Sequence, residues 1–216
     1  MSLKLEPIRR SIVVRCSVEQ AFRVFTQGLS NWWPLDSHSR AVDEELPGVT
    51  PVGVEMEPRV DGQVLERLSS GELLSWGRIM VWDPPARLVI AWKPNKKPYP
   101  PTELELSFRA EGGGTRVLLE HRGWERLGNA AEKMRAGYVQ GWPKVFDARY
   151  GEAAGRAGEP GPQDSGCPPA GHGLRGGART PPGLLPRCSY DPHRPVAAGI
   201  FSKELIGIFL SREGFL

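Results

Sequence analysis

Three side chains of this sequence, His121, Glu66 and Arg78, have types and positions that could support acid–base chemistry or anchor a polar ligand. In the segment TRVLLEHRGW, strand alternation places Val117, Leu119 and His121 on one face, so the imidazole should end a buried row. A buried histidine needs a hydrogen-bond partner, which Glu66 or Arg78 on neighbouring strands would supply. His121 therefore either closes a structural polar cluster or serves a cavity ligand as an anchor or general acid/base.

Glu66 and Arg78 carry the same two interpretations. Buried charges are tolerated mainly when they are paired, and a charged pair inside a cavity would orient the polar head group of a ligand. If strand alternation instead turns these two side chains outward, they are solvated surface charges.

The tryptophans favour a cavity, because all seven lie in the first 150 residues and a compact core would use more Leu, Ile and Val. Trp76 and Trp82 share strand parity with Arg78 and Met80, which predicts one common face. Aromatic walls with a few convergent polar groups are typical of sites for small apolar ligands. The candidate cavity residues are Trp32, Trp33, Glu66, Trp76, Arg78, Met80, Trp82, Trp92, Phe108, His121, Met134, Tyr138 and Trp142.

Trp32 and Trp33 stand side by side at the end of a short predicted helix, directly before Pro34. Adjacent helical residues point about 100° apart, so the two indoles cannot contact the same neighbour. We expect one to be a core side chain and the other, Trp33, to lie nearer the cavity mouth. The polar stretch DSHSRAVDEELPGVTP, residues 36–51, is expected to border the entrance.

Other chemistries have little support in the sequence. There is no Gly-x-Ser-x-Gly elbow, and Cys16 falls on the apolar row of the first strand, where it is interpreted as a core residue. The three glycines at 112–114 lie between two strands and predict a hairpin turn, not a phosphate loop. Cys167-x4-His172 and Cys188-x4-His193 are interpreted as coincidence within a Gly/Pro-rich region, so neither a metal nor a cofactor is predicted.

Composition and charge name no macromolecular partner. The 216 residues carry 28 basic and 25 acidic side chains, a balance that argues against attraction to nucleic acid or an anionic membrane. No stretch approaches the ~18 apolar residues of a membrane span, and three scattered cysteines are unlike a disulfide framework. We therefore predict a cytoplasmic protein with reduced thiols.

The composition changes abruptly near Tyr150. Residues 1–150 are predicted to form one domain, whereas residues 151–216 are a Gly/Pro-rich extension for which disorder is expected, either functional or not under selection. Only its end, IFSKELIGIFLSREGFL, regains an amphipathic pattern that would suit a short helix docking on the domain or on a partner.

The predicted elements of residues 1–150 are a strand, two short helices, six turn-bounded strands and a long helix. The first strand spans residues 8–16, and a capping-box pattern at Ser17 starts the first helix. The strand TELELSFRA alternates cleanly, which predicts an antiparallel sheet with one wet face. The long helix, residues 125–149, is interrupted by Gly137, Gly141 and Pro143.

This order of elements, together with several local phrases, resembles the START-like (SRPBCC) domains of the activator-of-heat-shock-protein-ATPase type over residues 8–148. The phrases are Ser17-Val18-Glu19-Gln20-Ala21-Phe22, Trp32-Trp33, Leu65-Glu66-Arg67, Trp76-Gly77-Arg78, Trp82-Asp83-Pro84-Pro85, Leu88-Val89-Ile90-Ala91-Trp92, Gly114-Thr115-Arg116-Val117, His121-Arg122-Gly123-Trp124, and Tyr138 with Gly141-Trp142. The resemblance implies an α+β helix-grip fold, in which a curved antiparallel sheet wraps a long C-terminal helix, with two short helices after the first strand.

The resemblance also implies a cavity between sheet and helix that holds apolar molecules or is adapted to a partner protein, but no shared reaction. The leading hypothesis is a non-catalytic domain that binds a small hydrophobic or amphipathic molecule. Two alternatives remain: a co-chaperone-like domain that stimulates a chaperone ATPase, and a cyclase- or hydrolase-type enzyme that uses His121 with Glu66 or Arg78.

Overall fold

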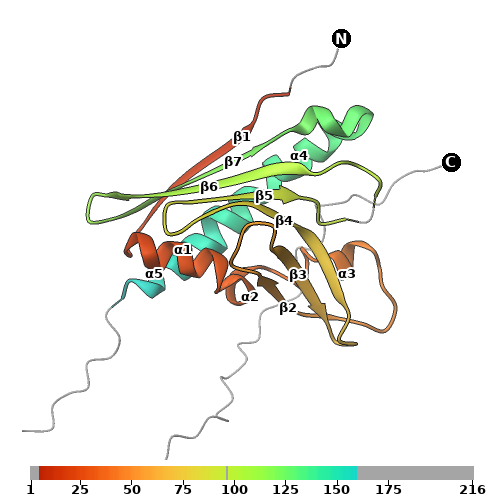
Figure 1. The fold of residues 1–216 in the computed structure, drawn as a ribbon, viewed down its shortest axis with the longest axis horizontal. Coiled ribbons are helices and arrows are strands. Elements are labelled where there is room, and N and C mark those ends of the chain that lie inside the picture. Colours follow the sequence, from red (N-terminus) through yellow and green to blue (C-terminus); the bar gives the residue numbers. More distant parts are fainter. Residues whose placement is uncertain (1–4, 96, 160–216) are drawn as a thin grey trace, which may run out of the picture. The chain divides into compact units, whose positions relative to one another are not determined.

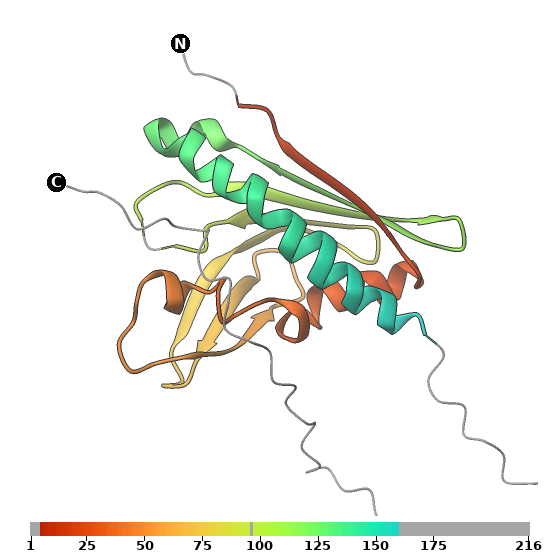
Figure 2. The same cartoon turned by 180° about the vertical axis from the view of Figure 1, so that it is seen from behind.

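The computed structural model describes residues 5–95 and 97–159, and these contain one seven-stranded antiparallel sheet with helices on its concave side (Figures 1 and 2). The strands are β1 (Ile8–Val14), β2 (Pro51–Met56), β3 (Gln63–Leu68), β4 (Leu73–Asp83), β5 (Arg87–Trp92), β6 (Thr102–Glu111) and β7 (Gly114–Arg122). The helical elements are α1 (Val18–Thr26), α2 (Leu29–Trp32), α3 (Arg40–Asp43), η1 (Trp124–Ala130), α4 (Ala131–Trp142), η2 (Pro143–Tyr150) and α5 (Gly151–Ala157). The predicted helix-grip fold is confirmed.

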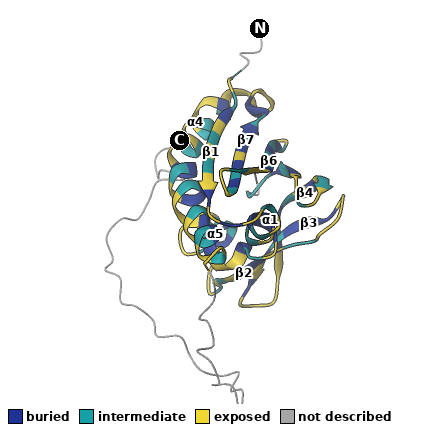
Figure 3. Cartoon of the chain, turned by 90° about the vertical axis from the view of Figure 1, so that its left-hand side faces the viewer, coloured by how far each residue is buried: buried dark blue, intermediate teal, exposed yellow. Residues whose placement is uncertain are grey.

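The sheet follows the chain as a meander from β2 to β7, and β1 then pairs with β7 to give the order β1-β7-β6-β5-β4-β3-β2. The two-residue turn between β6 and β7 uses Gly112 and Gly113, both at positive φ, which is the hairpin that the triple glycine predicts. The long helix lies diagonally across the concave face (Figure 2). Buried residues gather between these two layers (Figure 3), so the core occupies the sheet–helix gap.

The outer face of the sheet is polar, as the alternation in β6 predicts. Leu104, Leu106 and Phe108 are buried, whereas Glu103 and Glu105 face the opposite way and form ion pairs with Arg122 on β7. This ladder of opposite charges keeps the sheet wet on one side, and the apolar contacts are concentrated on the side of the helix.

The capping box at the start of α1 is present. The Ser17 hydroxyl accepts a hydrogen bond from the Gln20 backbone N–H, and the Gln20 side chain accepts one from the Ser17 backbone N–H. This cap sets the direction of α1, whose inner side buries Phe22 and Phe25 against the sheet–helix core.

The long helix extends beyond the predicted end at Arg149 and the predicted domain boundary at Tyr150. Pro143 begins a wider π-type stretch, and helix then continues through α5 to Ala157. Ala154 is fully buried, and the Gln20 side-chain amide donates a hydrogen bond to the Ala157 carbonyl. The composition of GEAAGRA predicted disorder, but its small side chains allow helix α5 to pack closely on α1. The Cys167/His172 and Cys188/His193 pairs and the terminal amphipathic segment lie outside the described residues.

Strand β4 carries two register shifts that a simple alternation misses. The first leaves Trp76 without an opposite residue on β3, and the second leaves Met80 without one on β5. Each inserted residue reverses which side chains face inward, so Ile79 becomes fully buried while Arg78 and Met80 are exposed. The prediction that Arg78 and Met80 share the inner face with Trp76 and Trp82 is therefore wrong.

The described residues contain neither a candidate membrane-spanning helix nor a candidate metal site. Among residues 5–95 and 97–159, no helix has the length and apolar character needed to cross a membrane. Within the same ranges, no group of three or more His, Cys, Asp or Glu side chains is arranged to hold a metal ion.

Candidate functional site

A cavity of about 50 Å³ lies between strands β4 and β5, the long helix and the segment that carries α3. Its wall is mainly aromatic, and its polar groups come from the α3 segment and from Tyr138. The lining residues are Trp33, His38, Ser39, Arg40, Asp43, Trp76, Trp92, Pro94, Tyr138, Gly141, Trp142 and Val145. A buried water needs roughly 10–15 Å³ in this measure, so the space suits a few waters or one small group.

Three tryptophans of the lining surround Trp33 at the centre of the aromatic wall. The Trp33 ring centroid lies 5.2 Å from that of Trp76, 5.8 Å from that of Trp92 and 6.3 Å from that of Trp142. These separations are typical of tilted and edge-to-face aromatic pairs. The cavity wall is therefore one continuous cluster built from two strands, the long helix and the turn after α2.

Every indole N–H of this wall donates to a protein acceptor. Trp33 donates to the His38 carbonyl at 2.5 Å and Trp76 to the Glu66 carboxylate at 2.6 Å. Trp92 donates to the Tyr138 hydroxyl at 3.0 Å, and Trp142 to Nδ1 of His121 at 3.2 Å. These bonds fix the ring orientations. Because the N–H groups are already bonded, the indoles can contact a ligand only through their carbon atoms.

The adjacent tryptophans at the end of α2 divide their roles. Trp32 is buried, donates a hydrogen bond to the Val24 carbonyl at 2.8 Å, and packs on Phe25 and Tyr150. Trp33 is only partly buried and lines the cavity. The structure thus places Trp32 in the core and Trp33 at the cavity.

His121 is fully buried in a hydrogen-bonded chain behind the cavity wall. Trp142 donates to its Nδ1, so Nε2 carries the proton and donates to the Thr102 hydroxyl at 2.8 Å, which in turn donates to the Trp92 carbonyl at 3.1 Å. Burial holds the pKa of the imidazole well below its usual value, and the ring is neutral. Both ring nitrogens are thus occupied, which supports the structural interpretation of His121.

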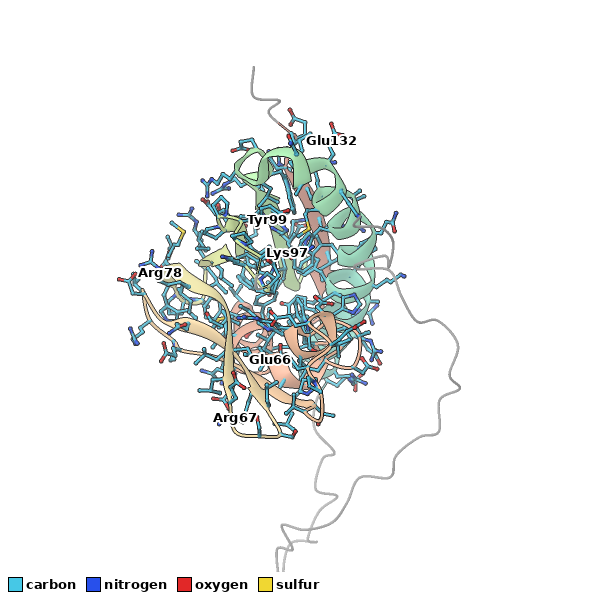
Figure 4. The ribbon with its side chains drawn as sticks, turned by 90° about the vertical axis from the view of Figure 1, so that its right-hand side faces the viewer. Glu66, Arg67, Arg78, Lys97, Tyr99 and Glu132 are labelled. Atoms are coloured by element: carbon cyan, nitrogen blue, oxygen red, sulfur yellow. The ribbon has the colours of Figure 1, made fainter. Side chains whose placement is uncertain are left out.

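Glu66 is also fully buried, and it acts as a clamp. Its carboxylate accepts hydrogen bonds from the backbone N–H groups of Arg40 and Ala41, at 2.6 and 3.0 Å, and from the Trp76 indole. The first turn of α3 is thereby tied to β3 and to the cavity wall. Figure 4 shows Glu66 within the molecule and Arg78 at its margin, where Arg78 pairs with Asp61 at 2.6 Å. The expected pairing of Glu66 or Arg78 with His121 is absent from the hydrogen bonds that His121 makes.

Asp43, His38 and Arg40 form the polar part of the lining. Burial, with the nearby carboxylates of Glu66 and Glu44, raises the pKa of Asp43 to about 6, and Lys97 opposes this shift. Burial lowers the pKa of His38. The Arg40 guanidinium donates to Glu44 and to the Ser75 carbonyl, so its charge is compensated within the protein.

The remaining predicted residues lie away from this cavity. Trp82 packs edge-on against Phe22, with ring centroids 5.2 Å apart, and Phe22 in turn contacts Phe108. Trp82 and Phe108 therefore belong to the core near α1. Met134 borders a second, smaller hollow of about 10 Å³ beside Trp124.

The cavity residues missed by the sequence analysis share modest or polar side chains that carry no periodic signal: His38, Ser39, Arg40, Asp43, Pro94, Gly141 and Val145. The first four fall within residues 36–51, the stretch expected to border the entrance. The signal for them was this position after the tryptophan pair, and it could not single out individual side chains.

Comparison with known proteins places this fold in a family. Residues 15–148 match the family model described as Activator of Hsp90 ATPase homolog 1-like protein. A synthase, "anthrahydroquino-Gama-pyrone synthase Txn09 complexed with SUM", is 33% identical, with 71% of this chain and 99% of that chain covered and a TM-score of 0.48.

Two further solved structures are similar to this chain. The self-sacrificing resistance protein CalC from Micromonospora echinospora is 27% identical, with coverages of 70% and 96% and a TM-score of 0.50. Protein NE0264 from Nitrosomonas europaea is 12% identical, with coverages of 70% and 92% and a TM-score of 0.48. The search of curated proteins returns no match. The family model covers more than half of the sequence, and the chain therefore belongs to the Activator of Hsp90 ATPase homolog 1-like family, within the SRPBCC helix-grip fold.

Proposed function

We propose that this domain binds a small hydrophobic or amphipathic molecule in the cavity between the sheet and the long helix. The observation that carries the proposal is the aromatic wall of Trp33, Trp76, Trp92 and Trp142, whose N–H groups are all taken by protein acceptors. A wall of carbon surface with a few polar groups at one side binds apolar matter and orients it.

The family name by itself does not select a chaperone function. CalC, at 27% identity, is a resistance protein on the same fold, which supports the general rule that function belongs to the site and not to the fold. Catalysis through His121 also gains little from the geometry, because both of its nitrogens are hydrogen-bonded to Trp142 and Thr102 behind the cavity wall.

Filling the cavity from the helix side tests the proposal. Gly141 lines the cavity, so Gly141→Leu should occlude it, whereas Ala136→Leu adds the same side chain at an exposed position of the same helix. A panel of small apolar ligands is first screened for binding, and the ligands that bind are titrated into the full chain by calorimetry. We expect them to bind both the unsubstituted protein and Ala136→Leu. Affinity should fall at least tenfold in Gly141→Leu.

Thermal unfolding of both variants controls for loss of the fold, and the smaller Gly141→Ala gives a graded comparison. The proposal is wrong if no member of the panel binds the folded chain, or if a bound ligand is indifferent to Gly141→Leu. Acceleration of a chaperone's ATP turnover by the unsubstituted chain, with no ligand binding, would favour the co-chaperone alternative.

A further inference from the structure

The cavity combines two features that would favour a cationic ligand: π-rich walls and a carboxylate that forms no bond with a described residue. Asp43 lines the cavity and is at the same time solvent-exposed, which marks the mouth. Its carboxylate makes no hydrogen bond or ion pair with any residue in the described ranges 5–95 and 97–159. Glu66, an acidic group close by, accepts its hydrogen bonds from the N–H groups of Arg40, Ala41 and Trp76.

Charged groups of both signs lie around Asp43. On the same helix, Arg40 is paired with Glu44, so the two largely cancel. Glu66 on β3 and Glu44 raise the proton affinity of Asp43, and Lys97 in the loop after β5 opposes them. The lining residue His38 has Lys144 and Arg149 on the helix side and Asp36 in its own loop as charged neighbours, and its own imidazole is driven toward neutrality by burial.

The aromatic wall also attracts cations. A cation over an indole or phenol ring is attracted by the negative face of the ring, most strongly for tryptophan. The N–H groups, which are the positive edges of these four indoles, are bound to protein acceptors and do not compete. Four tryptophans and Tyr138 therefore provide a cage whose electrostatics favour a cation.

The size of the cavity narrows the group further. At about 50 Å³ it has room for on the order of four waters, which is comparable to a branched head group and too small for a polycyclic ring system. An apolar remainder of the ligand would extend through the mouth beside Asp43.

We propose that the cavity recognises an alkylated ammonium group, with Asp43 as its counter-charge and Trp33, Trp76, Trp92, Trp142 and Tyr138 as its cage; this inference rests on the proposed ligand-binding function. The ligand class is an amphipathic quaternary or tertiary amine. Recognition is by charge and shape, and no bond is formed or broken.

The test compares choline with 3,3-dimethyl-1-butanol, a neutral molecule of the same shape in which carbon replaces the charged nitrogen. Both are titrated into the full chain and followed by the indole resonances in NMR spectra. We expect choline to bind about tenfold more tightly than the neutral isostere. Asp43→Asn should remove most of this preference, whereas Asp83→Asn, which makes the same change of charge at an exposed position at the far end of β4, should retain it.

Acidification gives a second measure on the unsubstituted chain. Protonation of Asp43 near pH 6 should weaken choline binding and leave the neutral isostere unaffected. The inference is overturned if the isostere binds as tightly as choline, or if Asp43→Asn, still folded by thermal unfolding, keeps the full preference. Binding of neutral apolar ligands alone would overturn the cation inference and leave the proposed function standing, whereas absence of all binding would overturn both.

Discussion

The sheet–helix gap contains two polar regions that differ in how completely their groups are satisfied. Around His121, an unbroken chain of hydrogen bonds joins the buried residues Trp142, His121, Thr102 and Trp92. Around Asp43, a carboxylate faces a cavity and forms no bond with another described residue. Buried polar groups are normally paired, which accounts for the closed chain around His121, whereas the exposed carboxylate of Asp43 is accessible to a ligand at the cavity.

Glu66 holds the region of Asp43 in place, because it ties α3 at the mouth to the wall tryptophan Trp76. The following predictions test whether the closed network contributes stability and the open group contributes binding.

The largest expected effect comes from removing the clamp. Glu66→Ala leaves two backbone N–H groups and one indole N–H without an acceptor, and we expect a loss of about 3 kcal/mol in the free energy of unfolding. Urea unfolding measures it, with Glu55→Ala on the exposed edge of β2 as a control that should change stability by less than about 1 kcal/mol. Equal effects of the two variants would contradict the assignment of Glu66 as a clamp.

The closed region should make the domain sensitive to acid. The pKa of His121 is lowered in the folded state, so below about pH 6.5 the unfolded chain gains a proton that the folded chain does not. Stability should therefore decrease as pH falls, by about 1.4 kcal/mol per unit for this group. His121→Gln should be less stable at pH 7 and should lack this component; an unchanged pH dependence would contradict a neutral, closed His121.

The open region should behave in the opposite sense. The pKa of Asp43 is raised from 3.8 to about 6, so the folded state retains the proton between these values while the unfolded state releases it. This contribution to stability is present at low pH and is lost as pH rises through that window. Asp43→Asn should stabilise the protein at pH 7 by about 1 kcal/mol, after allowance for solvent screening. A destabilised Asp43→Asn would show that Asp43 has a structural partner.

Much of this fold follows from local patterns in the sequence. The capping box at Ser17, the clean alternation of β6 and the glycine turn before β7 are each set by short-range chemistry. The two register shifts in β4 are not, because they depend on how neighbouring strands pair, and they turn Arg78 outward. The sequence did not predict helix α5, because its glycines and alanines gain stability through packing on α1 and β1.

The candidate site likewise contains residues that the sequence could predict and residues that it could not. Bulky residues such as Trp33, Trp92 and Tyr138 could be selected by type, since such side chains need either a core or a cavity. Asp43 and His38 could not be selected in this way. Their positions at the cavity depend on the hydrogen bonds by which Glu66 holds α3 next to Trp76. A polar loop carries no pattern that reports such a contact.

The most direct test of whether the cavity is the ligand site is an NMR titration of the full chain. A ligand from the panel that binds is added stepwise while the seven indole N–H resonances are recorded. A ligand in the cavity should shift the resonances of Trp33, Trp76, Trp92 and Trp142, which line it. The resonances of Trp32 and Trp82, which belong to the core, should stay nearly constant. Binding that shifts Trp82 and leaves the four wall tryptophans unchanged would contradict the assignment of this cavity as the ligand site.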